Sequence, residues 1–307
     1  GNLMPKNQTQ LETQLETYLD KIRKLDPRQR LLHWIRQREQ VRIAKSLGEE
    51  KPWTDDPILQ SYRFCNVQRI QDKVSQWLLL NWYQPNFNHA NMVIAAVLAR
   101  HFNQPSTLRA IGFPNFRMSR GNWDGYVVDS QDKIRVLKEH NHTVFNGAYI
   151  IRASGDYPNK VDMVLEETVQ QFVYDPPDLN TDSMEMCVEE LMHYRNIGSF
   201  MAGQICADLR WGLKGKWADK NKWAAMGPGS ARGMNRLHGR DVKCPLKQEQ
   251  FLEELQELIR FLKKALPSSI MNRLEAIDVQ NVLCETDKFN RVLFGEGRPK
   301  QKYDGAA

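Results

Sequence analysis

Apolar residues recur along most of this chain at the three- and four-residue spacing of an amphipathic α-helix. Over residues 11–47 they keep this spacing on both sides of Asp26 and Pro27, where one helix is expected to end and another to begin. An amphipathic helix is predicted over residues 248–266, stopped by Pro267, with one last helix after it. The same pattern predicts helices over residues 58–82, 91–102, 161–174 and 183–194. The chain is therefore expected to be mainly α-helical.

Residues 112–154 depart from the helical pattern. Apolar and polar residues alternate over 126–130 and again over 143–154, which predicts a few short strands or extended loops there. With 307 residues, 41% of them hydrophobic, the chain can bury a substantial core. We expect three parts: an N-terminal helical extension (1–30), one helical catalytic domain of two interlocked subdomains (31–303) and a tail (304–307).

A tight turn separates two of the predicted helices. Asn196, Ile197 and Gly198 interrupt the helical pattern, and Ser199 is suited to cap the helix that follows. A helix that starts after such a turn presents unpaired backbone N–H groups, which favour a phosphate. Asn196, Gly198 and Ser199 are therefore candidate DNA-binding residues.

Positive charge is concentrated in one region of the sequence. The chain has a net charge of +6, and residues 210–243 contain nine Lys or Arg against two acids. The rest of the chain is thus close to neutral. This distribution favours a surface that binds a polyanion, with a solvated lysine-rich loop as the alternative.

Within this region, arginines recur at four-residue intervals after a Gly-Pro-Gly turn. Arg232, Arg236 and Arg240 would form one basic stripe on a helix that starts at the turn. The backbone around Gly229, together with Arg232 and Arg236, is a candidate seat for a phosphate, either a leaving group or the DNA backbone, and Arg240 is a candidate DNA contact.

Another basic pair lies in the sequence YRFCNVQR. Arg63 and Arg69 are six residues apart, so in a helix they would lie on nearly the same side and could bind one phosphate. Asn66, between them, offers a donor and an acceptor that suit the edge of a thymine-like base. The alternative is that both arginines lie on a solvated face.

Acidic residues supply candidates for proton transfer. Asp219 follows the tight turn by about twenty positions and is a candidate general base, with an ordinary loop aspartate as the alternative. Glu285 and Asp287 are the next catalytic candidates for this base, and together with Lys288 they are also candidates for binding the amino or carboxylate group of an amino acid. In a helix, however, these three residues would be mostly adjacent rather than on one face.

Five cysteines are scattered through the chain without a CxxC pair or the spacing of Cys/His metal ligands. This indicates a reducing compartment and argues against a zinc site and against a disulfide framework. The sequence shows no apolar run of membrane-spanning length and no signal-peptide pattern. We expect a cytoplasmic protein with no metal, no cofactor and no membrane partner.

The order of tight turn and aspartate resembles the helix-hairpin-helix DNA glycosylases. Four stretches together, residues 51–69, 199–209, 224–240 and 278–303, resemble the alpha-glutamyl/putrescinyl thymine pyrophosphorylase family, which are phage amino acid:DNA transferases. A related module is the helical domain of 5-hydroxymethyluracil DNA kinase. The resemblance implies a DNA-glycosylase-like helical fold that flips a base out of the duplex.

The resemblance also implies a reaction. The amine of an amino acid, with glycine as one candidate, would displace phosphate or pyrophosphate from the 5-methylene carbon of 5-phosphomethyl-deoxyuridine in DNA. The expected partners are double-stranded DNA containing the modified thymine, a free amino acid and a 5-hydroxymethyluracil DNA kinase, in the host cytoplasm.

Two alternatives remain open. The first is a DNA glycosylase or hydrolase that acts on a modified thymine. The second is a non-catalytic DNA-binding module that accompanies the kinase. Bifunctional glycosylases carry a Schiff-base lysine at the position of Phe200, so strand-cleaving lyase chemistry is not expected here.

Overall fold

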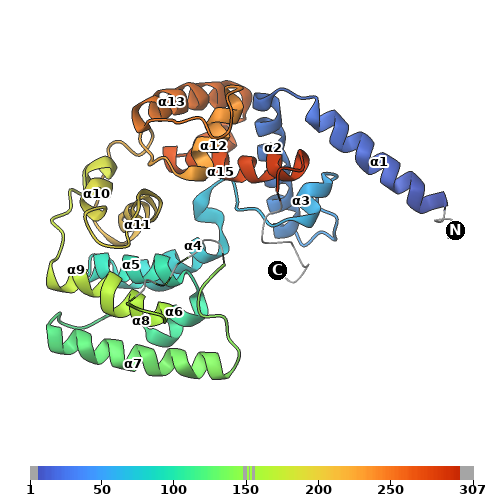
Figure 1. Cartoon of the computed structure of the whole chain (residues 1–307). Helices are drawn as coiled ribbons and strands as arrows, with labels where there is room; N and C mark the ends of the chain where they lie inside the picture. Colours follow the sequence, from blue (N-terminus) through green and yellow to red (C-terminus); the bar gives the residue numbers. More distant parts are fainter. Residues whose placement is uncertain (1–5, 148–150, 152, 154–155, 298–307) are drawn as a thin grey trace. The chain divides into compact units, whose positions relative to one another are not determined.

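The computed structural model describes residues 6–147, 151, 153 and 156–297. Over these residues the chain is mainly helical and contains no β-strand. It divides into two compact units (Figure 1): unit 1 comprises Gly1–Gln71 and Met226–Ala307, and unit 2 comprises Asp72–Ala225. None of the described helices is long and apolar enough to cross a membrane.

Unit 1 begins with two helices separated where the sequence predicts a break. Helix α1 (Lys6–Arg23) is followed by α2 (Pro27–Ser46). Asp26 caps α2, because its side chain accepts a hydrogen bond from Gln29 N, and Pro27 occupies the first turn, where its missing N–H costs nothing. The predicted break is therefore confirmed.

Helix α15 (Ala276–Leu293) is the centre of unit 1 and packs against α2, α3, α12 and α13. Leu283 and Phe289 of α15 are fully buried. The last predicted helix is divided, because residues 272–275 separate α14 from α15. The other elements of this unit are α3 (Pro57–Ser61), η1 (Arg69–Gln71), α12 (Pro228–Leu237), α13 (Gln248–Ala265) and α14 (Ser268–Met271).

Helix α5 (Met92–Phe102) is the core of unit 2 and packs against α11, α6, α9 and η4. Nearly every residue of α5 is buried, as expected of a helix covered on all sides. The other elements are α4 (Lys73–Leu78), η2 (Leu79–Tyr83), η3 (Gln84–Asn86), α6 (Pro105–Ile111), α7 (Arg120–Glu139), α8 (Lys160–Asp162), η4 (Met163–Val169), α9 (Gln170–Tyr174), α10 (Met184–Leu191) and α11 (Ser199–Gly212).

A buried ion pair joins α5 to α11. Asp208 is fully buried and accepts hydrogen bonds from Arg100 Nε at 2.6 Å and Nη2 at 2.9 Å, and from the Tyr83 hydroxyl at 2.5 Å. A buried carboxylate is tolerated when donors surround it in this way. Asp208 thus has a structural role within the stretch 199–209.

The predicted strand over residues 126–130 is wrong. These residues lie within α7, a helix of 20 residues that Ser119 caps by accepting a hydrogen bond from Asn122 N. The buried residues of α7, Trp123, Val127, Ser130 and Ile134, follow helical spacing, and this longer period outweighs the local alternation. Residues 143–147 form no strand, and most of 148–155 lies outside the described residues.

The predicted continuous helix over residues 58–82 is also wrong. It is divided into α3, an irregular segment over residues 62–68, and the elements η1, α4 and η2. Asp56 caps α3 through hydrogen bonds from Ile58 N at 2.8 Å and Leu59 N at 3.0 Å. The irregular segment carries several of the candidate site residues.

Candidate functional site

Close packing of α12 on α15 brings two of the motif stretches together. A Cβ atom on Gly233 would lie 2.4 Å from the backbone oxygen of Leu283, so only glycine fits at this position. One turn earlier, a Cβ on Gly229 would lie 3.2 Å from Cys284 Sγ. The glycines of α12 therefore let the two helices approach, which explains Gly229 without a ligand.

Because the two helices approach closely, two arginines of α12 form ion pairs with one acidic residue of α15. Asp287 of α15 is 1% exposed and accepts hydrogen bonds from Arg232 Nε at 3.0 Å and Arg236 Nη2 at 3.4 Å. Arg236 also donates a hydrogen bond to Glu296 at 2.7 Å, and this bond lowers the pKa of Glu296. Arg232 is more exposed than Arg236, so its guanidinium remains accessible while Asp287 fixes its Nε.

The irregular segment 62–68 contacts the next positions of α15. Glu285 Oε2 accepts a hydrogen bond from Cys65 N at 2.8 Å, and Lys288 Nζ donates to the backbone oxygen of Arg63. Lys288 Nζ also lies 4.6 Å from the ring centroid of Phe64. We call Arg63, Arg232, Glu285, Asp287 and Lys288 the α15 cluster.

The predicted helical relationship between Arg63 and Arg69 is wrong, because residues 62–68 are not helical. Arg69 is 4% exposed, and its backbone N–H donates to Asp278 Oδ1 at 2.8 Å. Asn66 Nδ2 donates to the Gln71 backbone oxygen at 3.0 Å. Asp278 of α15 thus anchors the start of η1, directly after the segment 62–68 that carries Arg63.

Arg240 does not extend the stripe of arginines. Helix α12 ends at Leu237, and Gly239 adopts a positive φ of 65° that turns the chain. Arg240 makes a two-point ion pair with Glu254 of α13, at 2.8 Å and 2.6 Å. The predicted stripe is therefore correct for Arg232 and Arg236 and wrong for Arg240.

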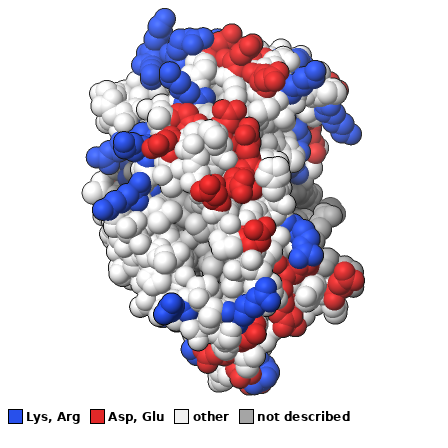
Figure 2. Space-filling view, turned by 90° about the vertical axis from the view of Figure 1, so that its left-hand side faces the viewer, with Lys and Arg blue, Asp and Glu red and all other residues white. Residues whose placement is uncertain are grey.

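These ion pairs change how the basic region is understood. The arginines at 232, 236 and 240 all pair with acids that lie outside residues 210–243. Figure 2 shows basic and acidic side chains interspersed on the face that it presents. Counting charges along the sequence overstates the positive charge that this region presents.

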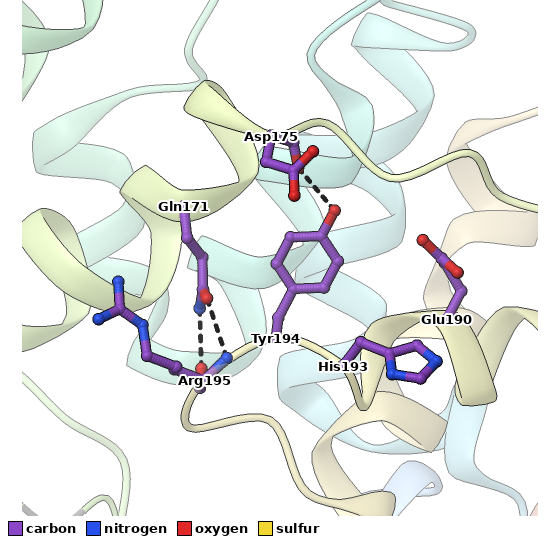
Figure 3. A pocket seen from close by; sticks show the side chains of 6 residues that line it. All are labelled: Gln171, Asp175, Glu190, His193, Tyr194 and Arg195. Carbon is purple, nitrogen blue, oxygen red and sulfur yellow. Dashed lines mark hydrogen bonds between the residues drawn. The ribbon is translucent and has the colours of Figure 1, made fainter.

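The predicted turn before α11 is present, with the cap shifted by one residue. Gly198 is the N-cap and Ser199 is the first residue of α11, so Ser199 does not cap the helix as the sequence predicts. Asn196 adopts a left-handed φ of 66°, and its side chain donates to Thr168 Oγ1 at 3.0 Å. A pocket of about 340 Å³ lies beside this turn (Figure 3).

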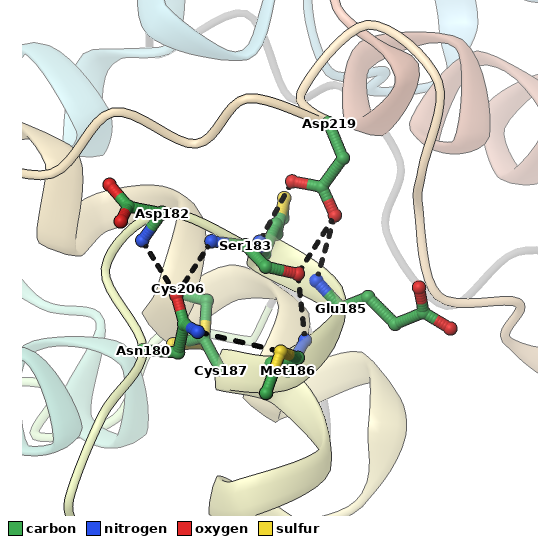
Figure 4. Close-up of a disulfide and its surroundings, with 9 residues drawn as sticks. Asn180, Asp182, Ser183, Glu185, Met186, Cys187, Cys206 and Asp219 are labelled. Atoms are coloured by element: carbon green, nitrogen blue, oxygen red, sulfur yellow. Dashed lines mark hydrogen bonds between the residues drawn. A yellow bond between two sulfur atoms is a disulfide. The ribbon is translucent and has the colours of Figure 1, made fainter.

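Asp219 caps a helix in unit 2. Its Oδ1 accepts a hydrogen bond from Met184 N at 2.8 Å, and its Oδ2 accepts one from Glu185 N at 3.1 Å (Figure 4). A carboxylate at the first turn of a helix is favoured by the helix dipole. Both oxygens of the candidate base are therefore engaged in holding the start of α10.

Cys187 and Cys206 form a disulfide that joins α10 to α11 (Figure 4). The sequence argument against a disulfide is wrong for this pair.

Cys284 does not belong to this disulfide. It lies in the contact between α12 and α15, where burial raises the pKa of its thiol to about 12. A thiol with this pKa is protonated near neutral pH and is a poor nucleophile.

The described residues contain no group of three or more His, Cys, Asp or Glu side chains that could hold a metal ion.

Two polar residues of the contact between α12 and α15 were not predicted. Gln280 donates to Ser230 Oγ at 3.0 Å, and that hydroxyl accepts from Gly227 N at 2.9 Å. The sequence DVQN was part of a motif stretch, but nothing in it indicated a partner in α12.

A known protein family matches most of this chain. Residues 27–298 match the family described as the helical domain of 5-hmdU DNA kinase. The chain belongs to this family. The 5-hmdU DNA kinase of Bacillus phage SP10 is 24% identical over 182 residues, which cover 53% of this chain and 27% of that protein. The chain thus matches about a quarter of that relative's length. No solved structure matches the chain.

The start of the family match coincides with the start of a helix. The match begins at Pro27, the first residue of α2, so α1 lies outside it. It covers the whole of unit 2 and every residue of the α15 cluster. The part of the chain that matches the 5-hmdU DNA kinase helical domain therefore contains the whole candidate site.

Proposed function

We propose that the chain takes part in the hypermodification of thymine in phage DNA, as a transferase that joins an amino acid to 5-phosphomethyl-deoxyuridine. The nitrogen lone pair of the amine attacks the 5-methylene carbon. The bond from this carbon to the phosphate oxygen breaks, and the phosphate leaves with that electron pair. The new C–N bond is completed when a base removes a proton from the nitrogen.

The observation that supports this proposal is the convergence of three motif stretches on α15. Residues 51–69, 224–240 and 278–297 lie far apart in sequence, yet hydrogen bonds join all three in unit 1. The cluster contains cationic groups suited to a phosphate and a carboxylate suited to a proton, which are two of the requirements of the displacement. Glu285 and Asp287 are two positions apart in α15 and contact different segments, Cys65 and Arg232, from different sides of the helix.

Arg232 is the proposed ligand of the leaving phosphate. An arginine presents its donors in a planar fork, and Asp287 uses Nε of Arg232, which leaves the terminal nitrogens for a phosphate oxygen. Lys288 adds positive charge from α15, and we propose that Arg63, an exposed residue whose backbone oxygen accepts a hydrogen bond from Lys288, adds a second cation. Charge placed where the leaving group becomes more negative lowers the barrier.

Glu285 is the proposed base. Its Oε2 accepts one hydrogen bond from Cys65 N, and a carboxylate has about four acceptor sites, so capacity remains for an ammonium proton. Asp219 stays a candidate for the same role, but both of its oxygens already accept hydrogen bonds from α10. The available acceptor sites therefore favour Glu285.

The test is nucleoside mass spectrometry of duplex DNA containing 5-phosphomethyl-deoxyuridine after incubation with the chain and a mixture of amino acids. We expect a nucleoside whose mass equals that of 5-hydroxymethyl-deoxyuridine plus one amino acid minus one water, with phosphate released. Loss of free base would instead indicate a glycosylase. Unchanged DNA would contradict both enzymatic functions.

Matched variants connect the activity to the cluster. Arg232→Ala is expected to lose transfer and Arg232→Lys to recover only part of it, because lysine keeps the charge but lacks the fork. Arg135→Ala, at an exposed arginine of α7, is the control and should leave transfer unchanged. Equal activity of Arg232→Ala and the control would remove the α15 cluster from the reaction.

A second candidate is a helical module that presents DNA to a kinase. It is favoured by the description of the matched family as one domain of a kinase and by the 27% coverage of the phage relative. In this case the chain alone would leave 5-phosphomethyl-deoxyuridine DNA unchanged. It would instead stimulate phosphorylation of 5-hydroxymethyl-deoxyuridine DNA when the SP10 kinase and ATP are added.

A further inference from the structure

The C-terminal end of α15 fixes the backbone of Glu296. Gly295 adopts a left-handed φ of 68°, and its N–H donates to the backbone oxygen of Val292 at 3.2 Å. The N–H of Glu296 donates to the backbone oxygen of Arg291 at 2.8 Å. These two hydrogen bonds form a Schellman motif, in which glycine is favoured at the left-handed position. The place of Glu296 is therefore set by the way in which α15 ends.

The carboxylate of Glu296 lies against the guanidinium of Arg236. Its Oε2 accepts a hydrogen bond from Nη2 at 2.7 Å, and its Oε1 accepts a longer one from Nη1 at 3.3 Å. Arginine binds the oxygens of a free carboxylate or phosphate in the same two-point arrangement. The side chain of Glu296 is 44% exposed, whereas that of Arg236 is 12% exposed. Glu296 thus occupies the position of an oxyanion ligand and remains accessible to solvent.

Positive charge around Arg236 exceeds the charge of the buried acid beside it. Asp287 accepts hydrogen bonds from both Arg232 and Arg236. Burial lowers the pKa of Arg30, and the nearby charge of Arg236 lowers it further. The hydrogen bonds of Arg30 go to neutral acceptors, an amide side chain and a backbone oxygen. If Glu296 moved away, three guanidinium groups would remain around one carboxylate, which favours the binding of another anion.

The two acids leave part of the Arg236 guanidinium unsatisfied. Within the described part of the chain, Nε of Arg236 is buried and has no hydrogen-bond partner. A buried N–H group without an acceptor costs free energy. The Glu296 carboxylate offers two oxygens, whereas a phosphate group offers at least three. The unpaired Nε therefore favours a ligand with more acceptor oxygens than Glu296 provides.

We propose that Glu296 is an internal competitor for a phosphate group, which displaces its side chain and binds between Arg232 and Arg236. This inference rests on the proposed function, in which phosphate leaves 5-phosphomethyl-deoxyuridine. Asp287 holds both arginines, so their guanidinium groups lie together on one side of α12. The backbone of Glu296 stays fixed while its side chain rotates away, and the carboxylate returns to Arg236 as phosphate leaves. Glu296 thus limits the affinity for phosphate and favours its release.

Calorimetric titration of the chain with inorganic phosphate tests the proposal. We expect Glu296→Gln to bind phosphate about threefold to tenfold more tightly than the parent chain, because a larger fraction of the molecules then has Arg236 open to a ligand. Glu253→Gln is the matched control, since it makes the same change of charge at an exposed position of α13. This control should leave the affinity for phosphate unchanged.

A second substitution and a second ligand locate the phosphate. In an Arg232→Ala background, Glu296→Gln should no longer tighten phosphate binding, because the bound phosphate needs both arginines. Glycine, which carries a carboxylate but no phosphate, should bind the parent chain and Glu296→Gln equally. In the transfer assay, inorganic phosphate should inhibit Glu296→Gln at concentrations about threefold to tenfold lower than it inhibits the parent chain.

The outcomes separate this inference from the proposed function. Unchanged or weaker phosphate binding in Glu296→Gln would overturn the inference, and so would an equal gain in Glu253→Gln, which would show a general effect of charge. A gain that persists without Arg232 would place the phosphate elsewhere, and a response to glycine alone would assign the site to a carboxylate. If phosphate binding changes as expected but the parent chain transfers no amino acid, the proposed function is wrong, and the competition between Glu296 and phosphate stands.

Discussion

The carboxylate of Asp287 lies between two arginines of α12 and accepts a hydrogen bond from Arg232 Nε at 3.0 Å. Asp287 is 1% exposed, whereas the side chain of Arg232 is 37% exposed. The pair therefore has a buried end that fixes its geometry and an accessible end that can meet a ligand. Asp287, a candidate for substrate binding in the sequence, is placed instead where it orients Arg232.

We predict that Asp287→Asn destabilises unit 1. Removal of one partner from a buried ion pair typically costs about 3–5 kcal/mol, and an asparagine that still accepts one hydrogen bond should bring the loss to the lower end of this range. Urea unfolding would measure it. The control is Asp132→Asn on α7, where the pair with Arg135 is exposed and a loss below about 1 kcal/mol is expected. Equal losses in the two variants would contradict the structural role of Asp287.

We predict that Gly233→Ala is strongly destabilising. The added methyl group would lie 2.4 Å from the backbone oxygen of Leu283, so α12 must move away from α15. Overpacking of this kind costs about 1–3 kcal/mol, which exceeds the gain of up to about 1 kcal/mol from replacing a helical glycine. Gly125→Ala is the control, because a Cβ at Gly125 of α7 meets no atom within 4 Å and should stabilise the protein. Thermal unfolding of both variants checks the opposite signs.

We predict that stability falls as the pH is lowered from about 6.5 to about 4. His101 of α5 is buried, and the loss of hydration lowers its pKa from 6.5 to about 4, although a hydrogen bond to the Val97 backbone oxygen opposes the shift. Between these values the unfolded chain binds a proton that the native state does not. The unfolding free energy therefore falls by up to about 1.4 kcal/mol per pH unit as the pH decreases.

Urea unfolding at several pH values would measure this dependence, with His101→Gln as the comparison. This variant retains a side-chain donor but does not titrate. Between pH 4 and 6.5, the unfolding free energy of this variant should change less steeply with pH than that of the parent chain. The difference in slope should be up to about 1.4 kcal/mol per pH unit, which corresponds to one titrating proton. Other groups that titrate in this range contribute to both proteins and cancel in the difference. Equal slopes would show that His101 is not the source.

The sequence predicted those elements that depend on short-range chemistry. The break before α2 follows from Asp26 and Pro27, and the end of α13 follows from Pro267. The strand predicted over residues 126–130 failed because alternation over five residues cannot be distinguished from part of a longer helical period. Trp123 and Ile134, which lie outside that window, carry the helical signal of α7.

The candidate site could be predicted only as a set of residues. The sequence analysis placed Arg63, Arg232 and the group Glu285, Asp287 and Lys288 in three separate motifs, and the pairings between them depend on contacts between distant segments. No local pattern indicates that Asp287 accepts a hydrogen bond from Arg232. The prediction that Arg63 and Arg69 lie on one side of a helix was wrong, because it interpreted their spacing as helical and residues 62–68 are irregular.

We predict that Asp219 contributes to stability rather than to the proton transfer. Asp219→Ala should lower the unfolding free energy by about 1 kcal/mol, because it removes the acceptor for Met184 N and Glu185 N at the start of α10. Asp182→Ala, at an exposed neighbour of the cap residue Ser183, is the matched control and should cost less than about 0.5 kcal/mol. The transfer assay then separates the two roles. If Glu285 is the base, Glu285→Gln should reduce the rate by about a hundredfold to ten-thousandfold, whereas Asp219→Asn should retain the rate per folded molecule. The reverse result, with a rate for Asp219→Asn that recovers as rising pH supplies free amine, would identify Asp219 as the base in spite of its hydrogen bonds to α10.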